Sequence, residues 1–171
     1  MFFWILKQIK KFVKILNSNA APSQIAAGFA LGALIGLVPM NLAYTLTISC
    51  IILLLNINIT ASLLGIAIFG VLSFAIYPLG ELLGYFLLVQ TTFLTPIWTF
   101  LYNLPFIPFL KFNNTLSLGS MIISYILFFP IYLAMKKFVI AYRKDLKTKL
   151  EKYKVFKILK LGKLTKWIPK R

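Results

Sequence analysis

The chain has 171 residues, of which 60% are hydrophobic and only 13% are charged, and its mean hydropathy is +0.88. This composition lies outside the range of ordinary soluble domains. Between Lys14 and Lys111 the one charged side chain is Glu81. The stretch between these lysines is long enough for several bilayer crossings of roughly 20 apolar residues each. We therefore predict an all-α, polytopic membrane protein.

The positive charges gather at the two ends of the chain, which carries a net charge of +16. Four lysines lie between Lys7 and Lys14, and fourteen lysines and arginines lie between Lys136 and Arg171. Basic segments of this kind bind nucleic acid or anionic membrane surfaces. Because apolar segments adjoin them here, we expect the lipid bilayer and its anionic lipids as partners, and no nucleic acid.

Residue types that carry catalysis or bind metals are scarce. The chain has no histidine, and its single cysteine, Cys50, lies inside an apolar run, so one chain cannot assemble a disulfide or a Cys/His metal site. The acids Glu81, Asp145 and Glu151 cannot form a carboxylate pair within the apolar spans. We expect no enzymatic activity, no metal and no cofactor, and we expect Cys50 to be a small buried packing residue.

The N-terminal segment, residues 1–17, places its lysines at helical spacing among apolar residues, which predicts a basic amphipathic helix lying in the membrane interface. Because the lysines are interspersed with the apolar residues, the segment does not resemble a cleaved signal peptide. The tail from Val139 repeats apolar positions every three or four residues between lysines, which predicts a second basic amphipathic helix ending near Gly162.

The first apolar segment, residues 23–38, carries three glycines that are each four residues apart and therefore lie on nearly one face of a helix: Gly28, Gly32 and Gly36. Small residues at this spacing allow two helix backbones to approach closely. The same face could instead line a substrate path. We predict close helix packing.

A second apolar segment, residues 42–55, follows a break at Pro39 and a turn at Asn41. The two segments would be roughly 24 and 21 Å long, both shorter than the roughly 30 Å hydrocarbon core. They could form a thin spanning hairpin, or a re-entrant loop that enters and leaves the membrane on one side. The sequence does not decide between the two.

Two longer spans follow, from Thr60 to about Val89 and from Leu116 to Met135. Thr60 is the predicted N-cap of the first, and Pro78 is expected to kink or end that helix. The connection between the spans is rich in aromatic residues and proline, which suits the headgroup layer. We predict four crossings, with a membrane domain at residues 18–137 and a cytoplasmic tail at residues 138–171. Because lysines cluster at both ends, both termini should be cytoplasmic.

Residues 22–39, PSQIAAGFALGALIGLVP, resemble the signature of an uncharacterised bacterial membrane family, the domain of unknown function number two thousand and sixty-two. A second block, Tyr102-Asn103 followed by FNNTLSLGS at residues 112–120, is similar to a compact subfamily of conserved hypothetical proteins. The likeness extends over about residues 16–143. It implies a small protein of the bacterial cytoplasmic membrane and brings no known catalytic residue. Related domains are sometimes joined to glycosyltransferases that use lipid carriers, which implies lipid handling.

Glu81 is the main candidate functional residue. A buried intramembrane acid without a cation would be a candidate proton-coupled site, whereas an acid at the outer interface would simply be hydrated. The asparagines at 41, 56 and 58 are predicted to serve turns and helix caps, although cargo coordination is the alternative. In the second family block, the polar candidates are Asn103, Asn113 and Asn114, and the last two also suit a helix start before Leu116.

Two classes of function remain: a carrier or lipid-handling protein, and a non-catalytic structural or assembly factor for other membrane machinery. Helices broken by proline and glycine favour the first, because such breaks are tolerated in membranes where they line a cavity or are buried in protein. A chain with so few helices encloses little space, so we expect a carrier of this size to form a homo-oligomer.

Overall fold

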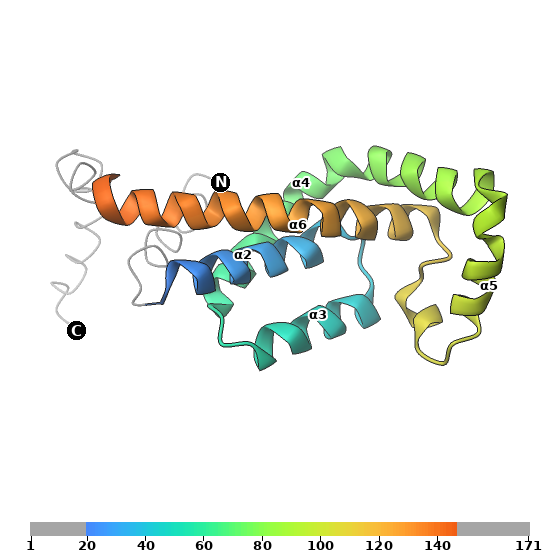
Figure 1. The fold of residues 1–171 in the computed structure, drawn as a ribbon, viewed down its shortest axis with the longest axis horizontal. Coiled ribbons are helices and arrows are strands. Elements are labelled where there is room, and N and C mark those ends of the chain that lie inside the picture. The colour runs from blue at the N-terminus through green and yellow to red at the C-terminus, as the bar shows by residue number, and fades with distance from the viewer. Residues whose placement is uncertain (1–19, 147–171) are drawn as a thin grey trace, which may run out of the picture.

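The computed structural model describes residues 20–146, and this part of the chain is all-helical, without strands (Figure 1). It contains the helices α2 (Pro22–Leu37), α3 (Leu42–Leu54), α4 (Ile59–Tyr85), α5 (Thr95–Tyr102) and α6 (Thr115–Ala141). Short helical turns lie at Phe86–Gln90, Thr92–Leu94, Ile107–Leu110 and Tyr142–Leu146. The predicted all-α class is confirmed for these residues. The predicted amphipathic helix at residues 1–17 and most of the basic tail lie outside them.

Asparagine side chains cap the three helices that follow turns. Each side-chain oxygen accepts a hydrogen bond from the backbone N–H three residues later: Asn41 from Tyr44 at 3.2 Å, Asn58 from Ala61 at 3.0 Å and Asn114 from Ser117 at 2.9 Å. Asparagine is a strong N-cap because its short side chain satisfies a free N–H of the first turn. The prediction of Thr60 as the cap of α4 was wrong, because Asn58 takes this position.

The two prolines predicted to break helices behave differently. α2 ends at Leu37, and Pro39 lies two residues beyond it. α4 continues through Pro78 to Tyr85, so of the two alternatives predicted for this proline, a kink or the end of the helix, the second was wrong. Proline removes one backbone hydrogen bond. Close contacts hold α4 on both sides of this position, with α2 at Gly65 and with α6 at Gly80.

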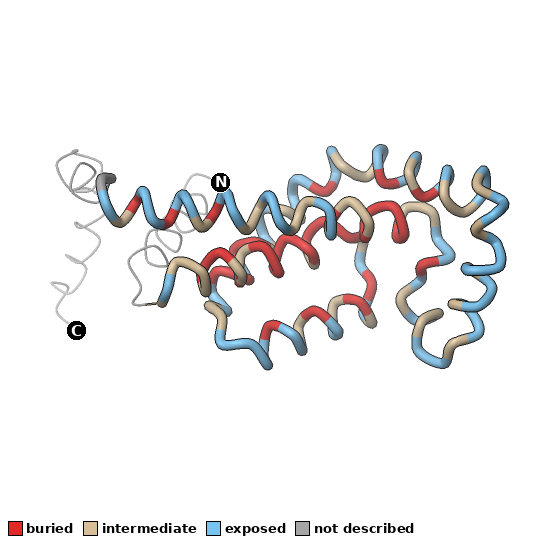
Figure 2. The backbone as a smooth tube through the Cα atoms, viewed as in Figure 1, coloured by how far each residue is buried: buried red, intermediate tan, exposed pale blue. Residues whose placement is uncertain are grey.

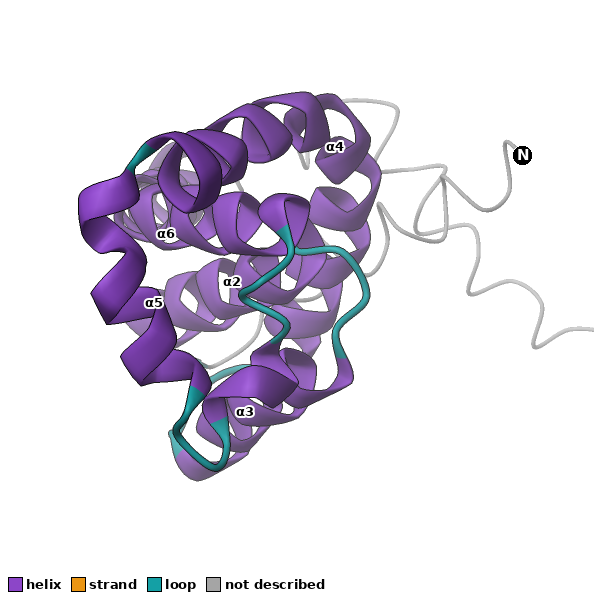
Figure 3. Ribbon diagram, turned by 90° about the vertical axis from the view of Figure 1, so that its right-hand side faces the viewer, coloured by secondary structure: helices purple, strands orange, loops and turns teal. Residues whose placement is uncertain are grey.

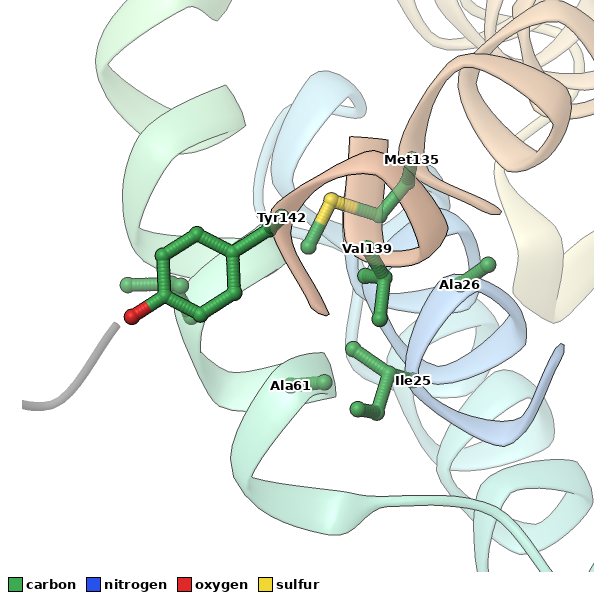
Figure 4. Packing of buried hydrophobic residues seen from close by; sticks show 7 residues of the cluster. Ile25, Ala26, Ala61, Met135, Val139 and Tyr142 are labelled. Carbon is green, nitrogen blue, oxygen red and sulfur yellow. The ribbon is translucent and has the colours of Figure 1, made fainter. Parts of the chain in front are cut away.

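Three helices form the core, and each of α2, α4 and α6 packs against the other two (Figures 1 and 3). Figure 4 shows the apolar cluster in which all three meet, and α2 is also the most completely buried helix in Figure 2. The cluster consists of Ile25, Ala26, Ala61, Leu64, Met135, Val139 and Tyr142. A second cluster, formed mainly by Leu31, Leu34, Val38, Tyr44, Ile48, Ile52 and Met121, packs α3 against α2 and α6.

The α2–α3 hairpin begins and ends at the same end of the molecule, which we call the basic end. The N–H of Asn58 donates to the carbonyl of Gln24 at 3.3 Å, and the guanidinium of Arg143 donates to the carbonyl of Ala20 at 2.8 Å. The start of α2, the start of α4 and the end of α6 therefore lie together. At the opposite end, which we call the α5 end, α5 crosses the end of the bundle from α4 towards α3 (Figure 3).

The helices differ in length and exposure. Residues 59–90 and 115–144 form helices that are long and apolar enough to cross a membrane, whereas α2 and α3 are shorter. Only 28% and 33% of the most apolar stretches of the two long helices are buried, so most of their residues are at least partly exposed. Cys50 is also exposed, on α3, so the expectation that it is buried was wrong. α3 buries only one face, and Cys50 lies outside it.

Candidate functional site

The glycines of α2 lie against the backbone of α4. A Cβ atom added to Gly28 would lie 2.5 Å from the carbonyl oxygen of Asn58, and one added to Gly36 would lie 2.8 Å from the nitrogen of Gly70. At Gly32 the added atom would overlap the carbonyl oxygen of Ser62. These distances leave no room for a side chain. The three glycines predicted to share one face thus all lie in the α2–α4 contact.

A second contact of the same kind joins α4 to α6, nearer the α5 end. A Cβ atom added to Gly119 would overlap the carbonyl oxygen of Gly80, and one added to Gly84 would overlap the carbonyl oxygen of Thr115. A Cβ added to Gly80 would lie 2.7 Å from the hydroxyl of Ser120, which is fully buried. Sequence reasoning missed this contact, although Gly80 and Gly84 have the four-residue spacing that was recognised in α2.

Glu81 lies at the edge of this α4–α6 contact. The hydroxyl of Thr115 donates a hydrogen bond of 2.6 Å to its Oε1 atom. The Glu81 side chain is otherwise exposed on the protein surface. α4 has risen 22 residues, or roughly 33 Å, between Ile59 and Glu81. The carboxylate therefore lies far from the basic end, next to the first residue of α6.

A pocket of about 430 Å³ adjoins this position at the α5 end. It exists because α6 begins at Thr115, opposite Gly84, whereas helical turns extend α4 to Gln90. Residues one turn beyond Gly84 therefore extend past the start of α6. The space beside these residues is the pocket, and residues of α5 and residues 112–113 line its other sides. The lining residues are Leu88, Val89, Trp98, Thr99, Tyr102, Phe112, Asn113 and Thr115.

Three aromatic rings form one wall of the pocket. Phe112 is buried, and its ring centroid lies 6.2 Å from that of Trp98 and 6.3 Å from that of Tyr102. The indole N–H of Trp98 donates to the carbonyl of Leu87 at 3.1 Å, which fixes the ring against the end of α4. Aromatic pairs at these separations contribute roughly 0.5–1.5 kcal/mol beyond their buried area. The wall is therefore held in place before any ligand binds.

Thr115 connects the pocket to Glu81, because its side chain lines the pocket and also donates to the carboxylate. The site thus combines an apolar floor, an aromatic wall and a carboxylate at one edge. Among the predicted polar candidates, Asn113 lines the pocket, Asn114 caps α6 and Asn103 closes the last turn of α5 through its backbone N–H.

Sequence reasoning placed the aromatic residues in the headgroup layer and missed that three of them line one pocket. Trp98 and Tyr102 are four residues apart and so share a face of α5, which was the available signal. Phe112 lies beyond a loop, and nothing in the sequence indicated that it would pack between them. The partner of Glu81, Thr115, was likewise not predicted.

Tyr102 is the one ionisable residue among those that line the pocket, and the Glu81 carboxylate lies beside it. In residues 20–146 no group of three histidine, cysteine, aspartate or glutamate side chains is arranged to hold a metal ion. The pocket itself contributes hydroxyl, amide and ring groups, with one carboxylate beside it. Such a set can orient an amphipathic ligand through hydrogen bonds and ring contacts.

These features define a helical protein with two helices long enough to cross a membrane and a small aromatic pocket at one end. The family described as "Uncharacterized protein conserved in bacteria (DUF2062)" matches residues 7–147, and the chain belongs to this family. The resemblance identified from the two sequence blocks is thereby confirmed.

One curated relative matches along nearly its whole length. It is an "Uncharacterized protein" of Treponema pallidum (strain Nichols), 26% identical over 164 residues, which are 95% of this chain and 99% of the relative. No solved structure matches the chain. The comparisons therefore establish the family and leave the activity to be inferred from the site.

Proposed function

We propose that this protein is an integral protein of the bacterial cytoplasmic membrane that binds and handles a lipid or a lipid-like amphiphile. Two observations support membrane integration: the length of the apolar helices at residues 59–90 and 115–144, and the incomplete burial of most of their residues. In water, so much exposed apolar surface would promote aggregation. In a bilayer the same surface faces lipid tails.

The proposed topology has two crossings, α4 and α6, with the α2–α3 hairpin entering and leaving on one side. α2 and α3, with 16 and 13 residues, are roughly 24 and 20 Å long, and both ends of the hairpin lie at the basic end. The short length of these two helices supports two crossings over the four predicted from the sequence, while the shared position of the hairpin ends fits both topologies. The two-crossing and the four-crossing topologies both place the two termini on the same side of the membrane.

The charge distribution supports a cytoplasmic location for the basic end. Lys136, Lys137, Arg143 and Lys144 lie at or near the basic end of α6, whereas the connection between α4 and α6 carries Lys111 alone. Cytoplasmic loops and tails carry an excess of lysine and arginine. The pocket and Glu81 would then lie towards the outer leaflet.

Labelling of introduced cysteines tests this topology. In a Cys50→Ser background, Met40→Cys places a thiol at the tip of the hairpin, where the side chain is fully exposed on the protein surface. Phe109→Cys places one in the outer connection. A membrane-impermeant maleimide added to whole cells should label position 109 quickly. The hairpin tip lies beside the outer connection, because Asn41 bonds to Leu110, so position 40 should be labelled more slowly if the tip stays within the bilayer. Equal labelling rates at the two positions would instead support a spanning hairpin and four crossings.

Lipid handling is proposed because of the pocket where α4 extends past α6. Its apolar floor and aromatic wall can hold the upper part of an acyl chain, while Asn113, Thr99 and Thr115 provide polar groups at the same opening. Tryptophan and tyrosine prefer this depth of a bilayer because one side of the ring is apolar and the other is polar. A lipid likewise has a polar group next to apolar carbon atoms at this depth.

Lipids retained by the gently purified full-length protein provide the test. Thr99→Trp should fill the pocket, whereas Phe100→Trp, on the same helix but outside the pocket lining, is the matched control. Mass spectrometry should find fewer bound lipids for the Thr99 variant only. Equal lipid retention by both variants would contradict lipid binding in the pocket. Recovery of one fixed protein complex in place of lipid would support the assembly-factor alternative.

A further inference from the structure

The α5 end carries little charge, and its one acid lies beside the pocket. In the described residues from 81 to 115, the charged side chains are Glu81 and Lys111. The Oε1 atom of Glu81 accepts the Thr115 hydroxyl, while an ionised carboxylate has about four acceptor positions in all. Glu81 is exposed, so most of these positions are accessible from outside the protein. The edge of the pocket is therefore a hydrogen-bond acceptor with negative charge.

Like the negatively charged edge, the aromatic wall favours a positively charged ligand. The faces of tryptophan, tyrosine and phenylalanine rings carry partial negative charge and attract cations within roughly 6 Å of the ring centroid. Trp98 and Tyr102 both lie next to Phe112 in the wall, and Tyr102 is 54% exposed, so a ring is accessible to a ligand. An anionic headgroup would meet repulsion from both the rings and the carboxylate.

We propose that the aromatic pocket and Glu81 together bind the ammonium headgroup of an amine-bearing lipid. This inference rests on the proposed lipid-handling function and specifies its ligand class. The ammonium group donates hydrogen bonds to the Glu81 carboxylate and lies against the ring wall. The carbon atoms next to it pack on Leu88 and Val89, which form the apolar part of the lining. Thr115 acts as a positioning residue, because its hydroxyl holds the carboxylate at the pocket edge.

The experiment uses full-length protein in nanodiscs that contain equal amounts of phosphatidylethanolamine and phosphatidylglycerol. After release into detergent, native mass spectrometry measures which lipid remains bound. The wild-type protein should retain phosphatidylethanolamine preferentially. Glu81→Gln should reduce this preference roughly fivefold, the upper range for a solvent-accessible ion pair. Gln keeps an oxygen that can accept the Thr115 hydroxyl, so the variant should fold.

Three further variants make the result specific. Glu151→Gln removes one acid from the tail and should leave the preference unchanged. Tyr102→Leu removes an exposed ring of the wall and should reduce the preference, whereas Phe100→Leu removes a similarly exposed ring outside the pocket and should not. A phosphatidylcholine arm shows whether a quaternary ammonium group is also accepted.

The outcomes separate this inference from the proposed function. If Thr99→Trp lowers lipid retention but Glu81→Gln leaves the preference for phosphatidylethanolamine intact, the pocket binds lipid and the ammonium proposal is overturned. If Thr99→Trp has no effect on any lipid, the proposed function itself fails. Preferential retention of phosphatidylglycerol by the wild-type protein would also overturn the ammonium proposal.

Discussion

The side-chain amide of Asn41 donates a hydrogen bond to the carbonyl of Leu110, a residue 69 positions later in the chain. Asn41 is buried at the tip of the α2–α3 hairpin, and Leu110 ends the short helical turn that precedes α6. Its side-chain oxygen meanwhile caps α3. One residue thus stabilises the start of a helix and joins the hairpin tip to the outer connection.

Replacing Asn41 with serine should remove the bond to Leu110 and keep the cap, because serine is as good an N-cap as asparagine. The loss of a buried hydrogen bond should lower the free energy of unfolding by about 1 kcal/mol. Asn58→Ser is the matched control, since Asn58 also caps a helix through its side-chain oxygen. Thermal unfolding in detergent should show a lower Tm for the Asn41 variant only. A similar loss in both variants would assign the effect to capping.

Gly119→Ala should destabilise the protein, because the added methyl group would overlap the carbonyl of Gly80 and force α4 and α6 apart. Overpacking of this kind costs about 1–3 kcal/mol. Gly70→Ala is the control, because its added Cβ meets nothing within 4 Å, and alanine should stabilise the helix by about 0.5–1 kcal/mol. Detergent-stable yield and Tm report both effects. Equal values for the two variants would mean that the α4–α6 contact tolerates the extra volume.

Gly32→Leu should damage folding or assembly more than Gly162→Leu. Gly32 lies directly against the backbone of Ser62, whereas Gly162 lies in the tail outside the described residues. The expected cause is steric exclusion at the α2–α4 contact. Size-exclusion chromatography of both variants measures yield and oligomer size. Identical profiles would contradict a packing role for the α2 glycines.

Glu81→Gln also tests whether this acid is a proton-coupled site. The variant should insert normally, because the substitution keeps the shape of the side chain and removes its charge. If proton coupling is essential, it should fail to restore the phenotype of a strain that lacks the protein. Full complementation would eliminate an essential proton-coupled role for Glu81. Immunoblotting of the membrane fraction confirms equal insertion.

Removing residues 152–171 should leave the protein inserted and weaken its binding to anionic lipid. The two proposed crossings end before this segment, which contributes eight lysines and arginines at the end of the chain. Each basic residue near an anionic leaflet contributes about 1 kcal/mol to membrane attraction. Flotation with vesicles of graded phosphatidylglycerol content measures the change. Failure of the shortened protein to insert would make the tail part of the membrane fold.

The sequence by itself determined the helical class, the two longest helices and the use of asparagines in turns and helix caps. These features are local: apolar runs specify helix length, and an asparagine before such a run caps it whatever lies nearby. The spacing of Gly28, Gly32 and Gly36 likewise defines one face of α2. It could not specify α4 as the neighbour, because spacing identifies a face and not the helix that covers it.

Only the tertiary structure decided where the hairpin ends lie, whether α4 continues through Pro78, and which residues meet at the pocket. The common location of the hairpin ends depends on the contacts of Asn58 with Gln24 and of Arg143 with Ala20, which join segments far apart in the chain. The pocket depends on α4 extending past the first residue of α6. That offset follows from the register in which Gly84 packs against Thr115, and a register between two helices is fixed by their packed side chains and not by either sequence alone.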